Sequence, residues 1–192
     1  LVFDEVITGL RVARGGARRT RPGPVRPALE TSLAVLQDGM ARRGIDLVVD
    51  APDDLPPVAC GQSDLEQVFL NLLTTAREAR AEGGRVSVHI QPEPEGIATT
   101  VADTGSGIAP EDLPRIFEPF FTTKATGNGL GLSICRSILW EVRGTLDLQS
   151  EPARGTRVYV TVPWASSPSA STALGAGASS SIPLGAGPRD TE

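Results

Sequence analysis

Residues 101–108 of this 192-residue chain read Val-Ala-Asp-Thr-Gly-Ser-Gly-Ile. An apolar run ends at Asp103, and Gly105 and Gly107 follow it at alternate positions. This pattern predicts a β-strand that delivers one carboxylate to its end, after which the backbone turns without a side chain in the way. The fold must therefore end a strand at Asp103 and leave space beside it, at the mouth of a pocket.

Hydrophobic periodicity predicts helices and strands in irregular alternation around this segment. We expect helices at residues 27–43, 63–80, 110–116 and 130–143, and strands at 45–49, 58–60, 85–90, 96–102, 144–149 and 156–162. Ser63, with Glu66 three residues later, predicts a capping box. The order of elements predicts an α+β fold, a two-layer α/β sandwich in which a mixed, mostly antiparallel sheet has its helices on one face.

The composition changes along the chain and predicts four segments. Residues 1–16 are periodic and end at two glycines, so we expect the end of a helix that begins before Leu1. Residues 17–26 are basic and proline-rich and predict a linker. Residues 27–164 form the folded domain, and Ser, Ala, Gly and Pro dominate residues 165–192, which predicts a disordered tail.

Charge and composition exclude several functions. The net charge is -5 and aromatic residues make up 4% of the chain, which argues against nucleic acid as a partner. Cys60 and Cys135 lack metal-ligand spacing and predict buried free thiols. No apolar run is long enough to predict a membrane span.

A second glycine cluster, Gly127, Gly129 and Gly131, opens the helix predicted at 130–143. Exposed N–H groups and the positive end of the helix dipole suit phosphate groups. The cluster is not a dinucleotide-binding fingerprint and it is not a P-loop, because it lacks the flanking strand, the ribose-binding acid and the Gly-Lys-Ser/Thr sequence.

Asn71 and Thr75 lie one turn apart on the predicted helix at 63–80. Asn71 sits beside the apolar stripe, where a magnesium ion that bridges phosphates would explain a polar side chain. A hydrogen bond to a neighbouring backbone group is the structural alternative.

Asp103 is suited to accept a hydrogen bond from the exocyclic amine of adenine, where guanine presents a carbonyl. Its structural alternative is an aspartate that caps a turn.

Four ordered motifs together are far more specific than any one of them. They are Asp-Leu-Glu-Gln-Val-Phe-Leu-Asn-Leu-Leu-Thr-Thr-Ala-Arg-Glu-Ala (64–79), Asp-Thr-Gly-Ser-Gly-Ile (103–108), Ile-Phe-Glu-Pro-Phe-Phe-Thr-Thr-Lys (116–124) and Gly-Asn-Gly-Leu-Gly-Leu-Ser-Ile (127–134), with Gly-Thr at 155–156. This arrangement resembles the catalytic, ATP-binding domain of two-component sensor histidine kinases, a branch of the GHKL superfamily with the Bergerat fold. The Phe-Phe-Thr-Thr-Lys sequence at 120–124 and the compact lid are most similar to the nitrogen-regulation type.

The resemblance implies roles for individual residues. Asp103 would recognise adenine, Gly105 and Gly107 would line the base pocket, and Thr156 would help to close it. The phosphates would be held by Lys124, Gly129, Leu130 and Gly131, and Mg²⁺ by Asn71 and Thr75. Phe117, Phe120 and Phe121 would tie a mobile lid to the core.

The resemblance also implies partners outside the chain. The γ-phosphoryl group of Mg-ATP would pass to a histidine on a separate helical-hairpin domain and then to a response regulator receiver domain. Residues 1–16 would be the end of the second hairpin helix. The domain would be cytoplasmic and monomeric, and the sequence leaves open whether the parent protein is anchored in a membrane.

Two departures from the family pattern matter. Thr75 occupies the position of the asparagine that is the principal magnesium ligand in the family, which predicts weakened Mg-ATP binding. His89 is the only histidine, and it lies in a predicted strand without a helical hairpin, so we expect it to be an ordinary exposed residue and not a phosphoacceptor.

Two alternatives remain beside the kinase domain. The first is a degenerate, regulatory domain, favoured by Thr75. The second is another GHKL ATPase or serine kinase. GHKL hydrolases place a glutamate base one turn before the magnesium asparagine, and Asn71 occupies that position here, which disfavours activation of water.

Overall fold

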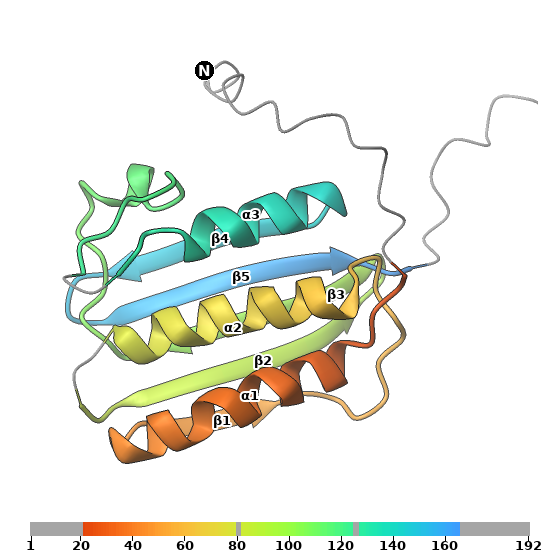
Figure 1. The fold of residues 1–192 in the computed structure, drawn as a ribbon, viewed down its shortest axis with the longest axis horizontal. Helices are drawn as coiled ribbons and strands as arrows, with labels where there is room; N and C mark the ends of the chain where they lie inside the picture. Colours follow the sequence, from red (N-terminus) through yellow and green to blue (C-terminus); the bar gives the residue numbers. More distant parts are fainter. Residues whose placement is uncertain (1–20, 80–81, 125–126, 166–192) are drawn as a thin grey trace, which may run out of the picture.

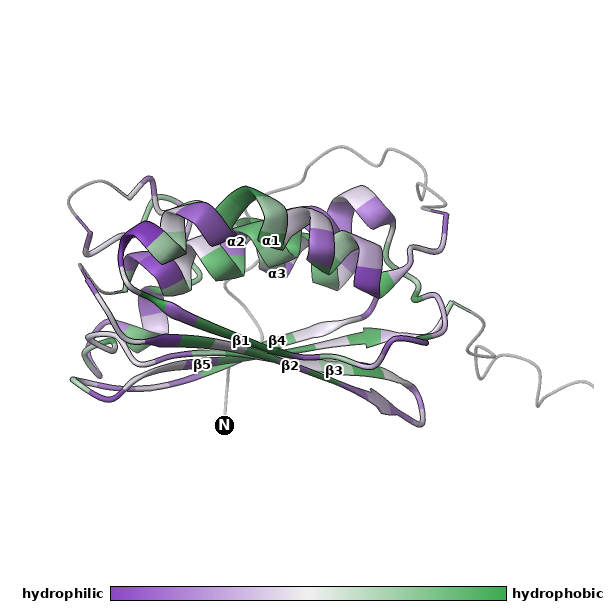
Figure 2. Ribbon diagram, turned by 90° about the horizontal axis from the view of Figure 1, so that it is seen from below, coloured by the Kyte–Doolittle hydropathy of each residue, from purple (hydrophilic) through white to green (hydrophobic). Residues whose placement is uncertain are grey.

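The computed structural model describes residues 21–79, 82–124 and 127–165. Its three α-helices are α1 (Val25–Arg42), α2 (Gln62–Glu78) and α3 (Gly131–Glu141). They form a single layer on one face of a sheet, as Figures 1 and 2 show. The predicted two-layer α+β sandwich is therefore confirmed.

The sheet has five strands in the order β1-β2-β3-β5-β4. These are β1 (Asp46–Asp50), β2 (Arg85–Glu93), β3 (Gly96–Asp103), β4 (Thr145–Glu151) and β5 (Gly155–Pro163). β1 pairs with β2 in parallel, and the other three pairings are antiparallel. The mixed, mostly antiparallel sheet is thus as predicted, and Asp103 is the last residue of a strand at its centre.

The core lies between the sheet and the helices. Alternate residues of β2, such as Val86, Val88 and Ile90, are at most 2% exposed and face the helices, as the period of two in a strand requires. On α2 the stripe through Leu65, Val68 and Leu72 is equally buried. Burial of each such side chain stabilises the fold by about 1.5–3 kcal/mol, and this fixes α2 over the centre of the sheet.

The first helix begins two residues earlier than predicted. α1 starts at Val25, which is 1% exposed and belongs to the core. Gly23 also pairs with Val58 in an isolated bridge. Pro24, between Gly23 and Val25, has an extended backbone and is the N-cap of the helix. Residues 23–25, which the sequence predicted as linker, therefore belong to the folded domain.

The prediction of a capping box at Ser63 is wrong. α2 begins at Gln62 with Gly61 as its N-cap, and no side chain caps it. Glu66 accepts a hydrogen bond from the side chain of Gln62 at 2.9 Å instead. Two further elements are shorter than predicted. The helix predicted at 110–116 is a 3-10 helix, η1 (Leu113–Arg115), and the strand predicted at 58–60 consists only of isolated bridges at Val58.

The predicted hairpin helix at 1–16, residues 17–20 of the predicted linker and residues 166–192 of the predicted tail lie outside the described residues. Within the described residues, no helix has the length and apolar character needed to cross a membrane.

Candidate nucleotide-binding site

A cavity of about 620 Å³ opens at one end of the sandwich. It lies where the C-terminal end of α2, the N-terminal end of α3 and the ends of β3 and β5 meet (Figure 1). The lid segment, residues 116–130 apart from 125 and 126, contributes a further part of its wall. Its size suits a small-molecule ligand. Nine of the ten predicted site residues line it: Asn71, Thr75, Asp103, Gly107, Lys124, Gly129, Leu130, Gly131 and Thr156.

Asp103 contributes the carboxylate on the sheet side of this cavity. Its Oδ1 accepts a hydrogen bond of 2.7 Å from the backbone N–H of Gly105. Burial raises the pKa of the Asp103 carboxyl, and the N–H groups of Gly105 and Thr156 and the charge of Lys124 offset this only in part. A carboxylate that has lost much of its water gains most from a ligand that donates a hydrogen bond.

Gly105 is the predicted site residue that does not line the cavity. A Cβ atom there would stand 2.5 Å from Cβ and 2.7 Å from the carbonyl oxygen of Ala79, just after α2. The N–H of Ser106 donates to that carbonyl at 3.0 Å. Gly105 therefore lets the turn pack against the end of α2, and it acts on the cavity through its hydrogen bond to Asp103.

Asn71 and Thr75 form the polar face of α2 toward the cavity. The Asn71 Nδ2 donates to the carbonyl oxygen of Gly131 at 3.3 Å, and its Oδ1 accepts from Gln67 at 3.0 Å. The Thr75 hydroxyl donates to the carbonyl oxygen of Asn71 at 2.8 Å. The structure thus shows the structural alternative, an asparagine bonded to backbone, and both residues also line the cavity.

The glycine cluster forms the junction between the lid segment and α3. Gly129 has a φ of +66°, and a Cβ there would overlap the backbone of Phe120. The Phe120 N–H donates to the carbonyl oxygen of Gly129 at 2.9 Å. Leu130 is the N-cap of α3, and its own N–H donates to Asn128 Oδ1 at 3.1 Å. The first turn of α3 is thereby held at the cavity wall.

Lys124 reaches back from the lid segment to α2. Its Nζ donates to the carbonyl oxygen of Thr75 at 3.0 Å and lies 3.5 Å from Glu78 Oε2. The lysine predicted to meet phosphates therefore stands at the cavity with its ammonium between the lid and the helix that carries Asn71.

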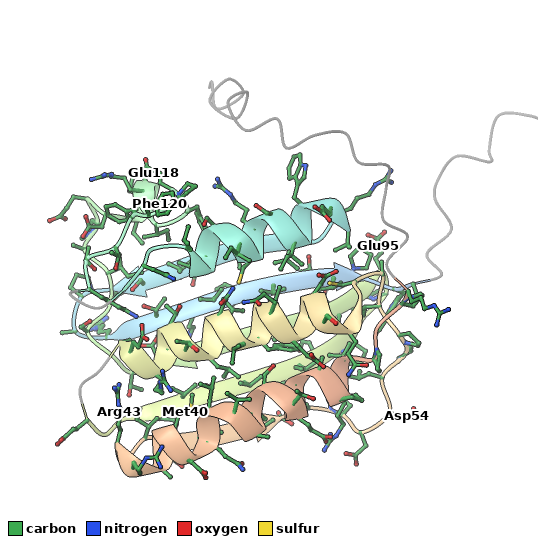
Figure 3. The ribbon with its side chains drawn as sticks, in the orientation of Figure 1. Met40, Arg43, Asp54, Glu95, Glu118 and Phe120 are labelled. Carbon is green, nitrogen blue, oxygen red and sulfur yellow. The ribbon has the colours of Figure 1, made fainter. Side chains whose placement is uncertain are left out.

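The three lid phenylalanines do not behave alike. Phe121 lines the cavity, with the guanidinium of Arg115 4.3 Å from its ring centre, and Phe117 stacks 5.3 Å from the guanidinium of Arg136. Phe120 is 74% exposed, and Figure 3 shows it on the outer edge of the lid. The prediction that Phe120 ties the lid to the core is wrong, because its backbone makes the closing contact, to Gly129, and its ring packs into no core.

Sequence reasoning missed Glu78, which lines the cavity, and Ser150, which supports Thr156 from β4. Glu78 lines the cavity, and its spacing of seven from Asn71 places it on the same helical face, so periodicity could have found it. Ser150 was not detectable, because its role depends on strand register: its Oγ accepts the N–H of Ile108 and lies 2.9 Å from the Thr156 hydroxyl.

His89 lies apart from the cavity, as expected. It occupies an exposed position in β2, and its Nδ1 is 2.8 Å from Asp50 Oδ2. Cys60 and Cys135 are free and buried, also as expected, and burial raises the pKa of each thiol to about 12.

A two-layer sandwich with one buried carboxylate, a polar helix face and a glycine-rich lid around one cavity defines a nucleotide-binding domain of the GHKL class. The chain belongs to the family described as histidine kinase-, DNA gyrase B-, and HSP90-like ATPases, which matches residues 60–166. ATP is the substrate that this membership implies.

Curated relatives narrow the class to sensor histidine kinases. Sporulation kinase E of Bacillus subtilis is 36% identical over 120 residues, which cover 62% of this chain and 16% of that protein. Sensor histidine kinase ZraS of Escherichia coli is 36% identical over 132 residues, covering 69% and 28%. The chain therefore spans less than a third of the length of these relatives.

Solved structures agree with this assignment. The catalytic domain of histidine kinase ThkA has a TM-score of 0.66 at 27% identity and covers 72% of this chain and 91% of its own. Full-length ShkA, in complex with AMPPNP, has a TM-score of 0.68 at 25% identity, covering 80% and 33%. The fold and family are those of a histidine kinase ATP-binding domain, and the nitrogen-regulation subtype stays a prediction.

Proposed function

We propose that this chain, over residues 27–164, is the catalytic domain of a two-component sensor histidine kinase. It binds Mg-ATP in the cavity and delivers the γ-phosphoryl group to a histidine outside the chain, for relay to a response regulator receiver domain. The observation that supports this best is the position of Asp103, a half-buried carboxylate at the end of a central strand, which lines the same cavity as the Asn71 face of α2 and the lid.

The adenine end of the site is assigned to the strand ends. Asp103 would accept the hydrogen bond of the adenine exocyclic amine, and the carbonyl of guanine would be repelled there. Thr156, which is 8% exposed, and Gly107 would border the base. Gly105 would keep the Asp103 carboxylate oriented through its N–H.

The phosphate end is assigned to the lid and the start of α3. Gly129, Leu130 and Gly131 would present backbone to the phosphates at the positive end of the α3 dipole, and Lys124 would add a positive charge. Positioning and neutralisation of charge are most of what phosphoryl transfer requires.

Asn71 and Thr75 fit a magnesium ion by the chemistry of their atoms, since an amide and a hydroxyl oxygen are hard oxygen ligands. When bound, the ion would neutralise phosphate charge. The described residues contain no group of three or more His, Cys, Asp or Glu placed to hold a metal, so phosphate oxygens and water would complete its coordination.

The acceptor and the partners lie outside the described residues. His89 is paired with Asp50 on an exposed strand position, which leaves the acceptor histidine to another domain. In this proposal residues 1–16 end the hairpin that precedes the linker, residues 165–192 are a disordered tail, and the domain is a cytoplasmic monomer.

A calorimetric titration tests the proposal. The purified chain is titrated with ATP with and without Mg²⁺, and with GTP as the control. We expect ATP binding that strengthens with Mg²⁺ and no binding of GTP. Equal binding of GTP would contradict the role of Asp103, and loss of the Mg²⁺ effect would contradict the roles of Asn71 and Thr75.

A second candidate function is a degenerate regulatory domain with weak Mg-ATP binding. Thr75 supports it, since its shorter side chain already donates its proton to the carbonyl of Asn71 at 2.8 Å. Absence of ATP binding by the folded chain would favour this second function.

A further inference from the structure

The C-terminal end of α2 is capped by a residue of the lid. α2 ends at Glu78, and the N–H of Ala79 donates to the carbonyl of Ala76 at 3.3 Å. The carbonyl oxygen of Thr75, which the Ala79 N–H would otherwise approach, accepts the Lys124 ammonium at 3.0 Å. An ammonium is favourable here because it satisfies a terminal carbonyl and meets the negative end of the helix dipole.

Glu78 provides the second contact of the same ammonium. Its Oε2 lies 3.5 Å from Lys124 Nζ, and the two side chains are 34% and 31% exposed. Both residues line the cavity. The pair therefore connects the helix that carries Asn71 and Thr75 to the lid.

We propose that Glu78 is a positioning residue that holds Lys124 against α2 in the nucleotide-free protein and competes with the phosphates of the nucleotide for this ammonium. The inference rests on the proposed function and deepens it: the negative charge of Glu78 would determine how readily Lys124 leaves α2 to bind the phosphates of the nucleotide.

The competition has a defined sign. A polyphosphate that enters the cavity meets a carboxylate and an ammonium that is already paired, so both repulsion and loss of the ion pair oppose it. Glu78→Gln removes the negative charge and preserves the shape of the side chain. We expect ATP to bind about two- to fivefold more tightly, the size of effect typical of a partly exposed ion pair. Adenosine, which lacks phosphates, should bind with unchanged affinity.

A first measurement needs no nucleotide. Lys124 is the only lysine of the chain, so selective ¹³C-lysine labelling yields one ε-methylene signal by NMR. In the wild-type chain we expect two inequivalent ε protons, typical of a held side chain. In Glu78→Gln, or at high salt, which screens the pair, the signal should move toward that of a freely rotating lysine.

Glu66→Gln is the matched control. It removes the same charge from the same helix, twelve residues or roughly 18 Å away along the axis, and it does not line the cavity. It should change neither the lysine signal nor the ATP affinity. Glu78→Asp, which keeps the charge, should bind ATP like the wild type.

The outcomes separate the inference from the proposed function. An unchanged lysine signal in Glu78→Gln would overturn the hold on Lys124. Weaker or unchanged ATP binding, or an equal change for adenosine, would overturn the competition. Failure of the wild-type chain to bind ATP or adenosine would overturn the proposed function and the competition together, while the NMR measurement would still decide whether Glu78 holds Lys124.

Discussion

Asp103 on β3 and Thr156 on β5 are register partners in adjacent antiparallel strands. Thr156 is itself fixed from β4, since its hydroxyl lies 2.9 Å from Ser150 Oγ. Three strands therefore hold the sheet side of the cavity, whereas the rest of its wall comes from α2, the start of α3 and the lid segment. The strand ends are suited to select the base, and the lid is suited to adjust affinity.

Asp103→Asn tests the selection of the base. We expect ATP affinity to fall about 10- to 100-fold, because hydrogen bonds to charged groups contribute about 1.5–3 kcal/mol. Calorimetry with ATP measures the loss. Asp147→Asn is a suitable control, since this carboxylate is exposed on β4 and lies outside the cavity. An equal loss in both variants would contradict a specific role for Asp103.

The raised pKa of Asp103 predicts an opposite effect on stability. The folded protein binds this proton more tightly than the unfolded chain, so stability falls as the pH rises from the ordinary aspartate range through the raised pKa. At neutral pH the carboxylate thus destabilises the fold. Asp103→Asn should raise the melting temperature at pH 7 and lose this advantage at acidic pH. A lower melting temperature at pH 7 would contradict the burial of this charge.

The same pKa predicts how binding depends on pH. The charged form accepts the adenine amine, so ATP affinity should decline as the pH falls through a pKa above the usual aspartate value. Titrations of wild type and Asp103→Asn across acidic pH measure this. The decline should be absent from the variant, and its persistence there would assign the effect to another group.

The sequence predicted the fold well where patterns are local. One face of each element is buried, so its apolar residues recur at a short, regular spacing. This spacing is visible in the alternation of Arg85–Glu93 and in the stripe of Leu65, Val68 and Leu72. The prediction of a capping box was wrong because Gly61, two residues before Ser63, is the N-cap of α2. Helix ends depend on a single hydrogen bond and are therefore less constrained than helix faces.

Site residues were predictable where a motif marks them and not where tertiary contacts decide. Asp103 and Gly129 stand in such motifs and line the cavity. Gly105 also belongs to such a motif, yet it packs against Ala79 and does not line the cavity. The contact between Lys124 and Glu78 joins residues 46 apart, and no periodicity links two such positions.

Thr75→Asn tests the departure from the family pattern. Asparagine would place an amide oxygen farther into the cavity than the threonine hydroxyl reaches. Gly131 has no side chain that would block it: even a Cβ added at Gly131 would lie 3.8 Å from Thr75 Oγ1. We expect Mg-ATP to bind about tenfold more tightly, a gain of about 1.4 kcal/mol, with no change when Mg²⁺ is chelated. If the variant bound and turned over Mg-ATP as the wild type does, Thr75 would not weaken the metal site.

Phe120→Gly tests the corrected role of Phe120. The residue has a φ of +68° and is 74% exposed, so glycine relieves backbone strain and removes little packing. We expect thermal unfolding to show a change in stability within about 1 kcal/mol. Phe121→Ala, which removes a ring that lines the cavity and stacks with Arg115, should lower stability more. The reverse order would restore Phe120 as the anchor.

Gly129→Ala and Gly131→Ala separate two reasons for glycine in the lid junction. At Gly129 a Cβ would overlap the backbone of Phe120, at a φ of +66°. At Gly131, the first residue of α3, the nearest atom would be Asn71 Cβ at an ordinary 3.7 Å. A left-handed backbone costs a residue with a side chain about 1–2 kcal/mol, and the backbone overlap adds to this.

We therefore expect Gly129→Ala to displace the lid, lower the melting temperature by several degrees and weaken ATP binding about tenfold or more. Gly131→Ala should fold with equal or higher stability, because alanine is the better helix former. Thermal unfolding and ATP titration of both variants measure this. Equal destabilisation by the two changes would mean that close packing throughout the cluster, and not the left-handed turn at Gly129, sets the geometry of the lid.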